Sequence, residues 1–118
     1  MDNEKTVLII DNGSEIIYNL KLVLWNLGCM IYESGKEDES ITYIVTKKPE
    51  IIFISLDTAK TDDFALLHKI RELHDCLLIV YSNGISREEL EHCINASVNE
   101  VLLNPEAQLE RLRKLVSS

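Results

Sequence analysis

Five short apolar segments alternate along the chain with longer segments whose apolar residues recur at helical spacing. The apolar segments cover residues 6–10, 29–32, 50–54, 76–81 and 100–103. Most of them lack an alternating polar pattern, which is typical of strands that are buried on both faces of a sheet. The order therefore predicts five strand–helix repeats in which a parallel sheet carries helices on both sides.

Local signals predict where several helices begin and end. Ser14 is a candidate cap for the first helix, and Gly28 is placed to end that helix in the left-handed conformation. The polar stretch 57–63 is expected to be a loop that leads into the third helix. A capping box at residues 86–89 opens the fourth helix, and Pro105 is expected to begin the last one.

Right-handed crossovers between parallel strands favour a doubly wound, flavodoxin-like α/β fold with strand order 2-1-3-4-5. The 118 residues suit one such domain, spanning residues 1–118. Ligands in these sheets bind where the carboxyl ends of strands one and three meet. The residues expected at this edge, together with the ends of strands four and five, are Asp11, Asn12, Ser55, Leu56, Asp57, Ser82 and Asn104.

Composition excludes several classes of partner. The formal net charge is −8 and the sequence pI is about 4.8, so the domain repels phosphate backbones and is not expected to bind nucleic acid itself. No apolar run approaches the roughly 20 residues that a membrane span needs, so no membrane contact is expected. The amino terminus also lacks the pattern of a secretory signal.

The three cysteines carry no recognisable chemistry. Cys29, Cys76 and Cys93 are odd in number, and their spacing matches neither a zinc site nor a redox pair. Cys76 and Cys93 lie in apolar segments, where a free thiol behaves as a small core residue. We therefore expect reduced thiols and a cytoplasmic protein.

The strand-end residues, taken in order, resemble those of the response-regulator receiver domain of two-component phosphorelay signalling. That family has an acidic pair after strand one, where this chain has Asp11-Asn12. Its third strand often follows Pro-Asp and ends in the phospho-acceptor aspartate; here the strand follows Pro49-Glu50 and the acceptor position falls on Ser55. Ser82 matches the family's Ser/Thr after strand four. Asn104-Pro105 stands where the family has Lys-Pro.

The resemblance implies a pocket that has lost most of its phosphorylation chemistry. Phosphoryl transfer to a carboxylate needs a nucleophile, a Mg²⁺ ion and a cation on the transferring group. Asn12, Ser55 and Asn104 replace an acid, the acceptor and the lysine, and Val101 replaces an aromatic switch residue. A degenerate or pseudo-receiver follows, with no enzymatic activity and no cofactor beyond weak Mg²⁺ binding by Asp11 and Asp57.

The resemblance also implies protein partners. These are other signalling proteins or an attached output domain, and the family's usual contact surface joins the fourth helix, fifth strand and last helix, which can also form a homodimer. In this chain that surface includes Leu90, Ile94, Val101, Arg111 and Lys114. Elsewhere on the surface, Trp25 is expected to cover the edge of the core, with Tyr18 exposed beside it.

Two alternative functions stay open from the sequence. The first is a receiver that is phosphorylated at an unusual acceptor, either Asp57 or Ser55. A serine acceptor requires an adjacent general base, and no histidine falls at a strand end. The second is a small-molecule-binding flavodoxin-like domain. Against it, the segment after strand one, residues 11–15, holds a single glycine and is no phosphate-binding loop.

Overall fold

The structure is a computed structural model that describes residues 4–117. Five parallel strands form one sheet in the order β2-β1-β3-β4-β5, as the repeat pattern predicts. The strands are β1 Thr6–Ile10, β2 Met30–Ser34, β3 Ile51–Ser55, β4 Leu77–Ser82 and β5 Glu100–Leu103. The second, third and fourth strands each end one or two residues later than expected, which brings Ser55 and Ser82 into the sheet itself.

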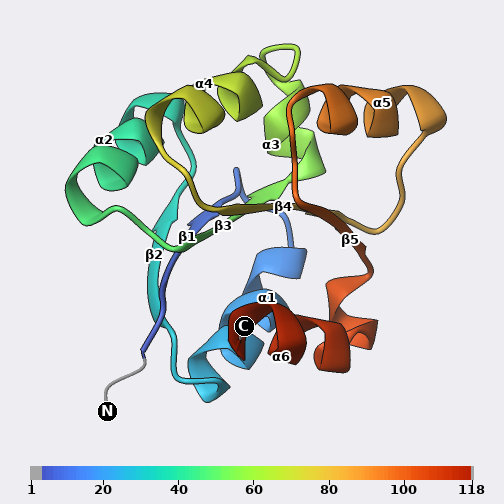
Figure 1. Cartoon of the computed structure of the whole chain (residues 1–118). Helices are drawn as coiled ribbons and strands as arrows, with labels where there is room; N and C mark the ends of the chain where they lie inside the picture. The colour runs from blue at the N-terminus through green and yellow to red at the C-terminus, as the bar shows by residue number, and fades with distance from the viewer. Residues whose placement is uncertain (1–3, 118) are drawn as a thin grey trace.

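The helices cover both faces of the sheet (Figure 1). One layer holds α1 Ile16–Asn26, the short 3-10 helix η1 Pro105–Ala107 and α6 Leu109–Ser117. The other layer holds α2 Glu37–Lys47, α3 Leu56–Lys60, α4 Ala65–Leu73 and α5 Arg87–Asn95. Among the described residues, no helix is long and apolar enough to span a membrane.

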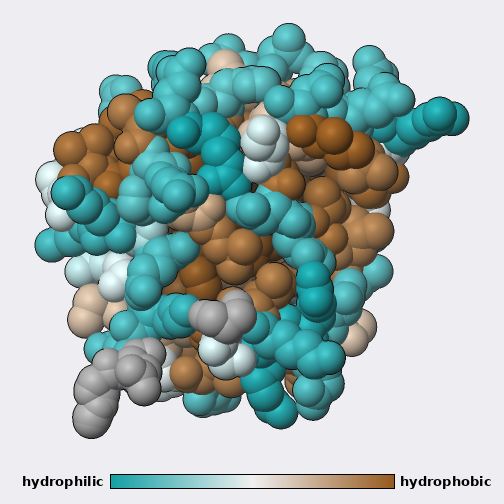
Figure 2. Space-filling view, viewed as in Figure 1, coloured by the Kyte–Doolittle hydropathy of each residue, from teal (hydrophilic) through white to brown (hydrophobic). Residues whose placement is uncertain are grey.

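Alternate residues of each central strand enter the two cores that flank the sheet. In β1, Leu8 and Ile10 pack against the layer of α2 to α5, while Val7 and Ile9 pack against α1 and α6. All four side chains are fully buried, which confirms that the strand is covered on both faces. Figure 2 shows one side of the molecule, on which hydrophobic residues form a band between the two more hydrophilic helix layers.

The segment after β3 is helical rather than an open loop. We expected residues 57–63 to be a loop because they are polar, but α3 begins directly at Leu56. The Ser55 side chain caps this helix by accepting a hydrogen bond from the Thr58 backbone N–H at 3.2 Å. Leu56 and Ala59 anchor it in the core, since both are at least 95% buried. The capping hydroxyl and these two apolar side chains outweigh the polar composition of the stretch.

Some expected helix ends are confirmed and others are wrong. Gly28 has a φ of +86° after α1, and Ser86 forms the capping box of α5 with Glu89. Ser14 does not cap α1, because Glu15 occupies the cap position and the Ser14 side chain bonds to Asp11 instead. Pro105 begins a 3-10 turn, and the last α-helix starts only at Leu109.

Trp25 lies on the surface, so the expectation that it covers the core edge was wrong. Its side chain is 71% exposed, and Tyr18 is 68% exposed as expected. Ile17, Leu20 and Leu24 already face the sheet. Trp25 follows Leu24 by one residue, which rotates it about 100° around the helix and away from the sheet.

Candidate functional site

A shallow pocket lies at the carboxyl ends of β1 and β3, where the strand order predicts it. Its volume is about 260 Å³. Four of the sequence-predicted residues line it together: Asp11, Asn12, Ser55 and Asp57. Thr58 and Thr61 of the α3 segment complete the wall on the side of β3. Of the other predicted residues, Leu56 is buried in the first turn of α3, and Ser82 and Asn104 are not part of the lining.

The Asp11 carboxylate is held by hydrogen bonds from within the chain. The Ser14 backbone N–H donates to Oδ1 at 2.8 Å, and the Ser14 hydroxyl donates to Oδ2 at 2.6 Å. The Tyr81 hydroxyl, on β4, also donates to Oδ2. Asp11 is only 6% exposed. Both oxygens therefore serve as internal acceptors that join the β1–α1 turn to β4.

Burial keeps the Tyr81 hydroxyl protonated. The ring is fully buried, and desolvation, followed by the hydrogen bond to Asp11, raises the pKa of Tyr81 well above its usual range. A buried phenol needs an acceptor, and Asp11 supplies it. The pair is a structural link between two strands that are 70 residues apart in the sequence.

Ser55 and Thr58 form a second internal pair. The Ser55 hydroxyl donates to Thr58 Oγ1 at 2.7 Å and accepts from the Thr58 backbone N–H. The same Thr58 oxygen accepts a hydrogen bond from the Asn12 backbone N–H at 3.0 Å. Ser55 is 4% exposed. These bonds tie the start of α3 to the end of β1, so the Ser55 hydroxyl is engaged within the fold.

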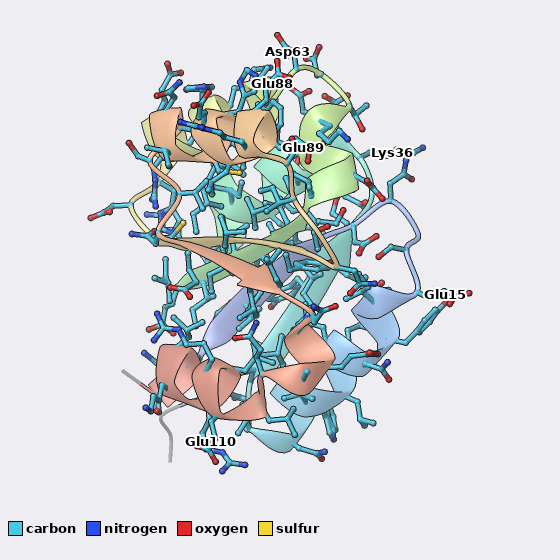
Figure 3. The ribbon with its side chains drawn as sticks, turned by 90° about the vertical axis from the view of Figure 1, so that its right-hand side faces the viewer. Glu15, Lys36, Asp63, Glu88, Glu89 and Glu110 are labelled. Atoms are coloured by element: carbon cyan, nitrogen blue, oxygen red, sulfur yellow. The ribbon has the colours of Figure 1, made fainter. Side chains whose placement is uncertain are left out.

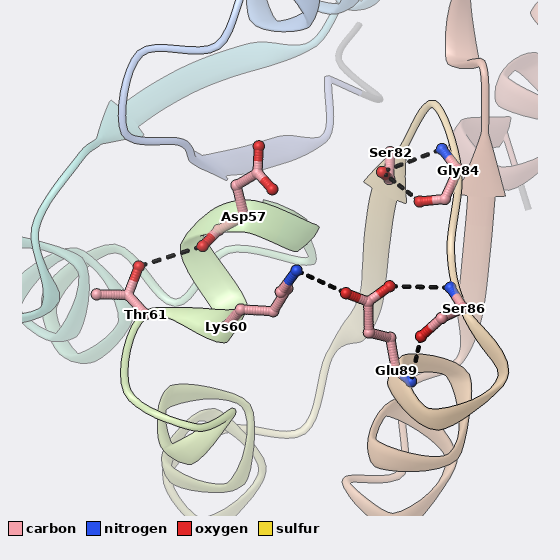
Figure 4. A network of polar contacts seen from close by, with 7 residues as sticks. All are labelled: Asp57, Lys60, Thr61, Ser82, Gly84, Ser86 and Glu89. Atoms are coloured by element: carbon pink, nitrogen blue, oxygen red, sulfur yellow. Dashed lines mark hydrogen bonds and ion pairs between the residues drawn. The ribbon is translucent and has the colours of Figure 1, made fainter.

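Asp57 sits on the exposed rim of the pocket, next to a lysine that points elsewhere (Figure 4). Lys60 Nζ pairs with Glu89 of α5 at 2.6 Å. The hydrogen bond with Glu89 is the main cause that raises the pKa of Lys60, and the same bond lowers the pKa of Glu89. Lys60 therefore connects α3 to the capping box of α5, and its ammonium group is not directed at Asp11 or Ser55.

Ser82 and Asn104 form hydrogen bonds in the segments that follow β4 and β5. The Ser82 hydroxyl donates to the Gly84 carbonyl at 2.7 Å and accepts from the Gly84 N–H at 3.2 Å (Figure 4). Asn104 has a φ of +50°, and its backbone N–H donates to the Ser82 carbonyl at 2.8 Å. Both residues stabilise the turns after β4 and β5. The structure therefore brings four of the seven expected strand-end residues into one pocket and leaves Leu56, Ser82 and Asn104 outside its lining.

The pocket does not fit a Mg²⁺ ion well. Such an ion takes an octahedral set of oxygens, typically from one or two carboxylates with waters and phosphate. Asp11 has both oxygens committed to donors of the chain, and Asn12 is neutral. Within residues 4–117 no group of three or more histidine, cysteine or acidic side chains is placed to hold a metal ion. Weak Mg²⁺ binding by Asp11 and Asp57 stays a prediction.

Two residues that shape the pocket were missed by the sequence reasoning. Tyr81 was treated as part of an apolar strand, and Thr58 as part of a loop. Tyr81 did carry a signal, because a tyrosine within an otherwise aliphatic buried strand must find an acceptor for its hydroxyl. Thr58 carried no such signal. Its role depends on the presence of α3, and the polar composition of residues 57–63 predicted a loop there instead.

The predicted partner surface lies along the β5 edge of the sheet. Ile94 and Leu90 of α5 are 65% and 37% exposed, and Val101 of β5 is half-buried. Arg111 of α6 pairs with Glu100 at 2.6 Å, and Lys114 is exposed. Figure 3 looks onto this edge and shows Glu88 and Glu89 in the α5 layer, with Glu110 in the opposite layer of α6. The five residues belong to α5, β5 and α6, the elements that form this edge.

The fold matches solved receiver domains over nearly its whole length. A response regulator from Thermotoga maritima is 23% identical, with a TM-score of 0.82 over 98% of this chain and 99% of that one. A two-component response regulator from Clostridium difficile is 25% identical, with a TM-score of 0.82 over 96% and 93%.

A third similar structure contains a metal. It is the receiver domain of a Pseudomonas aeruginosa sensor histidine kinase with a magnesium ion coordinated in its active site cleft, 16% identical, with a TM-score of 0.79 over 98% and 99%. No family model and no curated protein matches the chain.

Proposed function

We propose that this chain, which has the receiver-domain fold of response regulators, acts as a protein-interaction module whose output does not depend on phosphorylation. The observation that carries the proposal is the state of Asp11. Both of its carboxylate oxygens accept hydrogen bonds from Ser14 and Tyr81, so the one acid retained at the end of β1 is committed to the fold.

Ser55 is a poor phosphoryl acceptor in this setting. A serine hydroxyl needs a general base to become a nucleophile. The Ser55 hydroxyl donates to Thr58, and the three histidines serve elsewhere. His92 stacks on Phe64 at 4.4 Å between ring centroids, His74 bonds to the Pro49 carbonyl at 2.6 Å, and His68 lies on the exposed side of α4.

The cation that would stabilise a transferring phosphoryl group is also missing from the lysine position. Asn104 is neutral and exposed, and Lys60 is paired with Glu89. Transfer to a carboxylate relies on positioning and charge stabilisation more than on covalent chemistry. A pocket with one committed acid, a capping serine and a diverted lysine lacks the required arrangement, which supports a role based on surface contacts.

For that role we propose the α5–β5–α6 edge, containing Leu90, Ile94, Val101, Arg111 and Lys114, as the surface for a different signalling protein or an output domain. The α5 helix adds Glu88 and Glu91, both exposed, beside the apolar Ile94. This combination suits a partner that offers apolar side chains bordered by basic ones.

Treatment with acetyl phosphate or phosphoramidate in the presence of Mg²⁺ tests the proposal. We expect no added phosphoryl group, as followed by intact-mass spectrometry. A stoichiometric gain of one phosphate in the unmodified chain would contradict it, and Ser55→Ala and Asp57→Asn variants would then locate the unusual acceptor.

A restored variant is the positive control. Asn12→Asp, Ser55→Asp and Asn104→Lys return the missing groups, and Tyr81→Phe releases one hydrogen bond from Asp11. We expect phosphorylation only when the groups are combined, because residues that act as a unit are strongly non-additive. Circular dichroism of each variant must first show the native helix content.

A further inference from the structure

Three large apolar side chains form a strip along the outer face of α1. Tyr18, Leu22 and Trp25 are 68%, 60% and 71% exposed. Their spacing of four and then three residues places them on one side of the helix. Among the described residues, α5 has two exposed large apolar side chains, and each other element with any has one. We call Tyr18, Leu22 and Trp25 the α1 strip.

The α1 strip is nearly free of charge. Between Ile16 and Asn26 the only ionisable side chain besides Tyr18 is Lys21. Lys21 pairs with Glu33 of β2 at 2.6 Å, and its ammonium lies 5.6 Å from the centre of the Tyr18 ring. The Lys21–Glu33 pair at the border of the strip toward β2 therefore has no net charge. On the other side the border is formed by Asn19 and Asn26, and the Asn19 side chain donates a hydrogen bond to the Glu106 carboxylate of η1.

We infer that the α1 strip is the contact surface of a weak two-fold homodimer of this chain. A protein of net charge −8 repels its own copies over most of its surface. That repulsion is smallest where the surface has no acid. The α5 helix carries three glutamates against the single Arg87, so it is acidic and suits a basic partner. The α1 helix has no acidic residue between 16 and 26, and its bordering acids are Glu33, which is paired with Lys21, and Glu15 and Glu106 at the end near Tyr18.

The strip is also self-complementary. In an antiparallel pair of α1 helices with the two-fold axis near Leu22, Tyr18 of each copy lies against Trp25 of the other, because these residues flank Leu22 by one helical turn. The arrangement gives two aromatic contacts and allows Lys21 to reach the Glu33 of either copy. Glu15 lies at the outer end of the strip, so the two copies of Glu15 are far apart.

The available area sets the strength of this contact. A standard interface buries about 800 Å² on each partner, and a Tyr or Trp side chain contributes roughly 150–250 Å² when fully buried. Two aromatics and one leucine of the observed exposure therefore supply about half of a standard interface. We expect a dissociation constant weaker than about 1 μM, with Trp25 contributing most. The inference does not depend on whether the pocket can be phosphorylated.

Sedimentation velocity over a range of protein concentrations measures the association. We expect the unmodified chain to dimerise in the micromolar to millimolar range and Trp25→Glu or Leu22→Glu to weaken the dimer at least tenfold. Ile94→Glu is the matched control, since Ile94 is 65% exposed but lies on α5. It should leave the dimer unchanged. All three positions are exposed, so circular dichroism should show unaltered folding.

Two further measurements make the result specific. Trp25 is the only tryptophan of the chain, so its fluorescence should shift to shorter wavelength as the concentration rises. Mixing Leu22→Glu with Leu22→Lys should restore association that neither variant shows alone, because the two side chains meet near the axis.

Three outcomes would overturn the inference. The first is a chain that stays monomeric at millimolar concentration, which would leave the strip for a different protein. The second is a dimer abolished by Ile94→Glu but not by Trp25→Glu, which would place the homodimer on the α5–β5–α6 edge. The third is a failure of the two Leu22 variants to rescue each other.

Discussion

The strand-end pocket and the outer face of α1 differ in whether their side chains have partners within the chain. In the pocket, the Asp11 and Ser55 side chains have their partners inside the chain, namely Ser14, Tyr81 and Thr58. On α1, two aromatic rings and a leucine face solvent. A buried group with all its bonds made stabilises the fold and has little left to offer a ligand, whereas exposed apolar area lowers the free energy only when something covers it.

The difference supports the proposal that surface contacts, rather than the pocket, carry the function. A pocket at this edge draws attention because ligands bind there in such sheets, yet here the Asp11 and Ser55 side chains are engaged in holding β1, β3 and β4 together. The α1 strip lies on a helix that no sequence motif marks. Single substitutions in the two regions test whether the pocket groups are structural and the α1 groups are not.

The largest effect is expected for Asp11→Ala. The change leaves the Tyr81 hydroxyl buried without its acceptor and removes both bonds to Ser14. We expect a loss of about 2–4 kcal/mol in the free energy of unfolding, measured by urea denaturation. Asp57→Ala is the control within the same pocket, and because Asp57 is exposed it should cost less than about 1 kcal/mol. Equal costs for the two variants would mean that Asp11 is not structural.

A pair of tyrosine variants compares the two regions with the same chemical change. Tyr81→Phe removes the buried hydroxyl that bonds to Asp11 of the pocket and should cost about 1–3 kcal/mol of unfolding free energy. Tyr18→Phe removes an exposed hydroxyl from the α1 strip and should change stability by less than about 0.5 kcal/mol. Both are measured at a concentration low enough to keep the chain monomeric. An unchanged free energy of unfolding in Tyr81→Phe would show that the bond to Asp11 contributes nothing to stability.

The smallest effect is expected in the alkaline range. Because the pKa of Tyr81 is raised in the folded state, its contribution to stability is full below the unfolded pKa of about 10 and falls as the pH rises above it. The loss from this group is at most about 1.4 kcal/mol for each pH unit. At alkaline pH, the tyrosinate absorbance of the folded protein should be lower than that of the unfolded chain by the contribution of one of its four tyrosines. In Tyr81→Phe this difference should vanish; its persistence would assign the protonated hydroxyl to another residue.

The architecture and the position of the pocket could be predicted from the pattern of residues along the chain. Apolar segments alternate with helical ones, and a right-handed crossover leaves few topologies for such a chain. Parallel strands bring their carboxyl ends to one edge, so Asp11, Asn12, Ser55 and Asp57 could be predicted to meet there, and they line one pocket. These inferences need only local pattern and a general rule of chain geometry.

The contacts that these residues make could not be predicted, because they depend on segments that are distant in the sequence. Asp11 is occupied because Tyr81 lies beside it, although the two are 70 residues apart in the sequence. The polar residues after Ser55 form α3 because Leu56 and Ala59 find room in the core. Trp25 is exposed because no element within residues 4–117 covers that side of α1. Each outcome depends on neighbours that the fold brings together, and a pattern along the chain has no means of recording them.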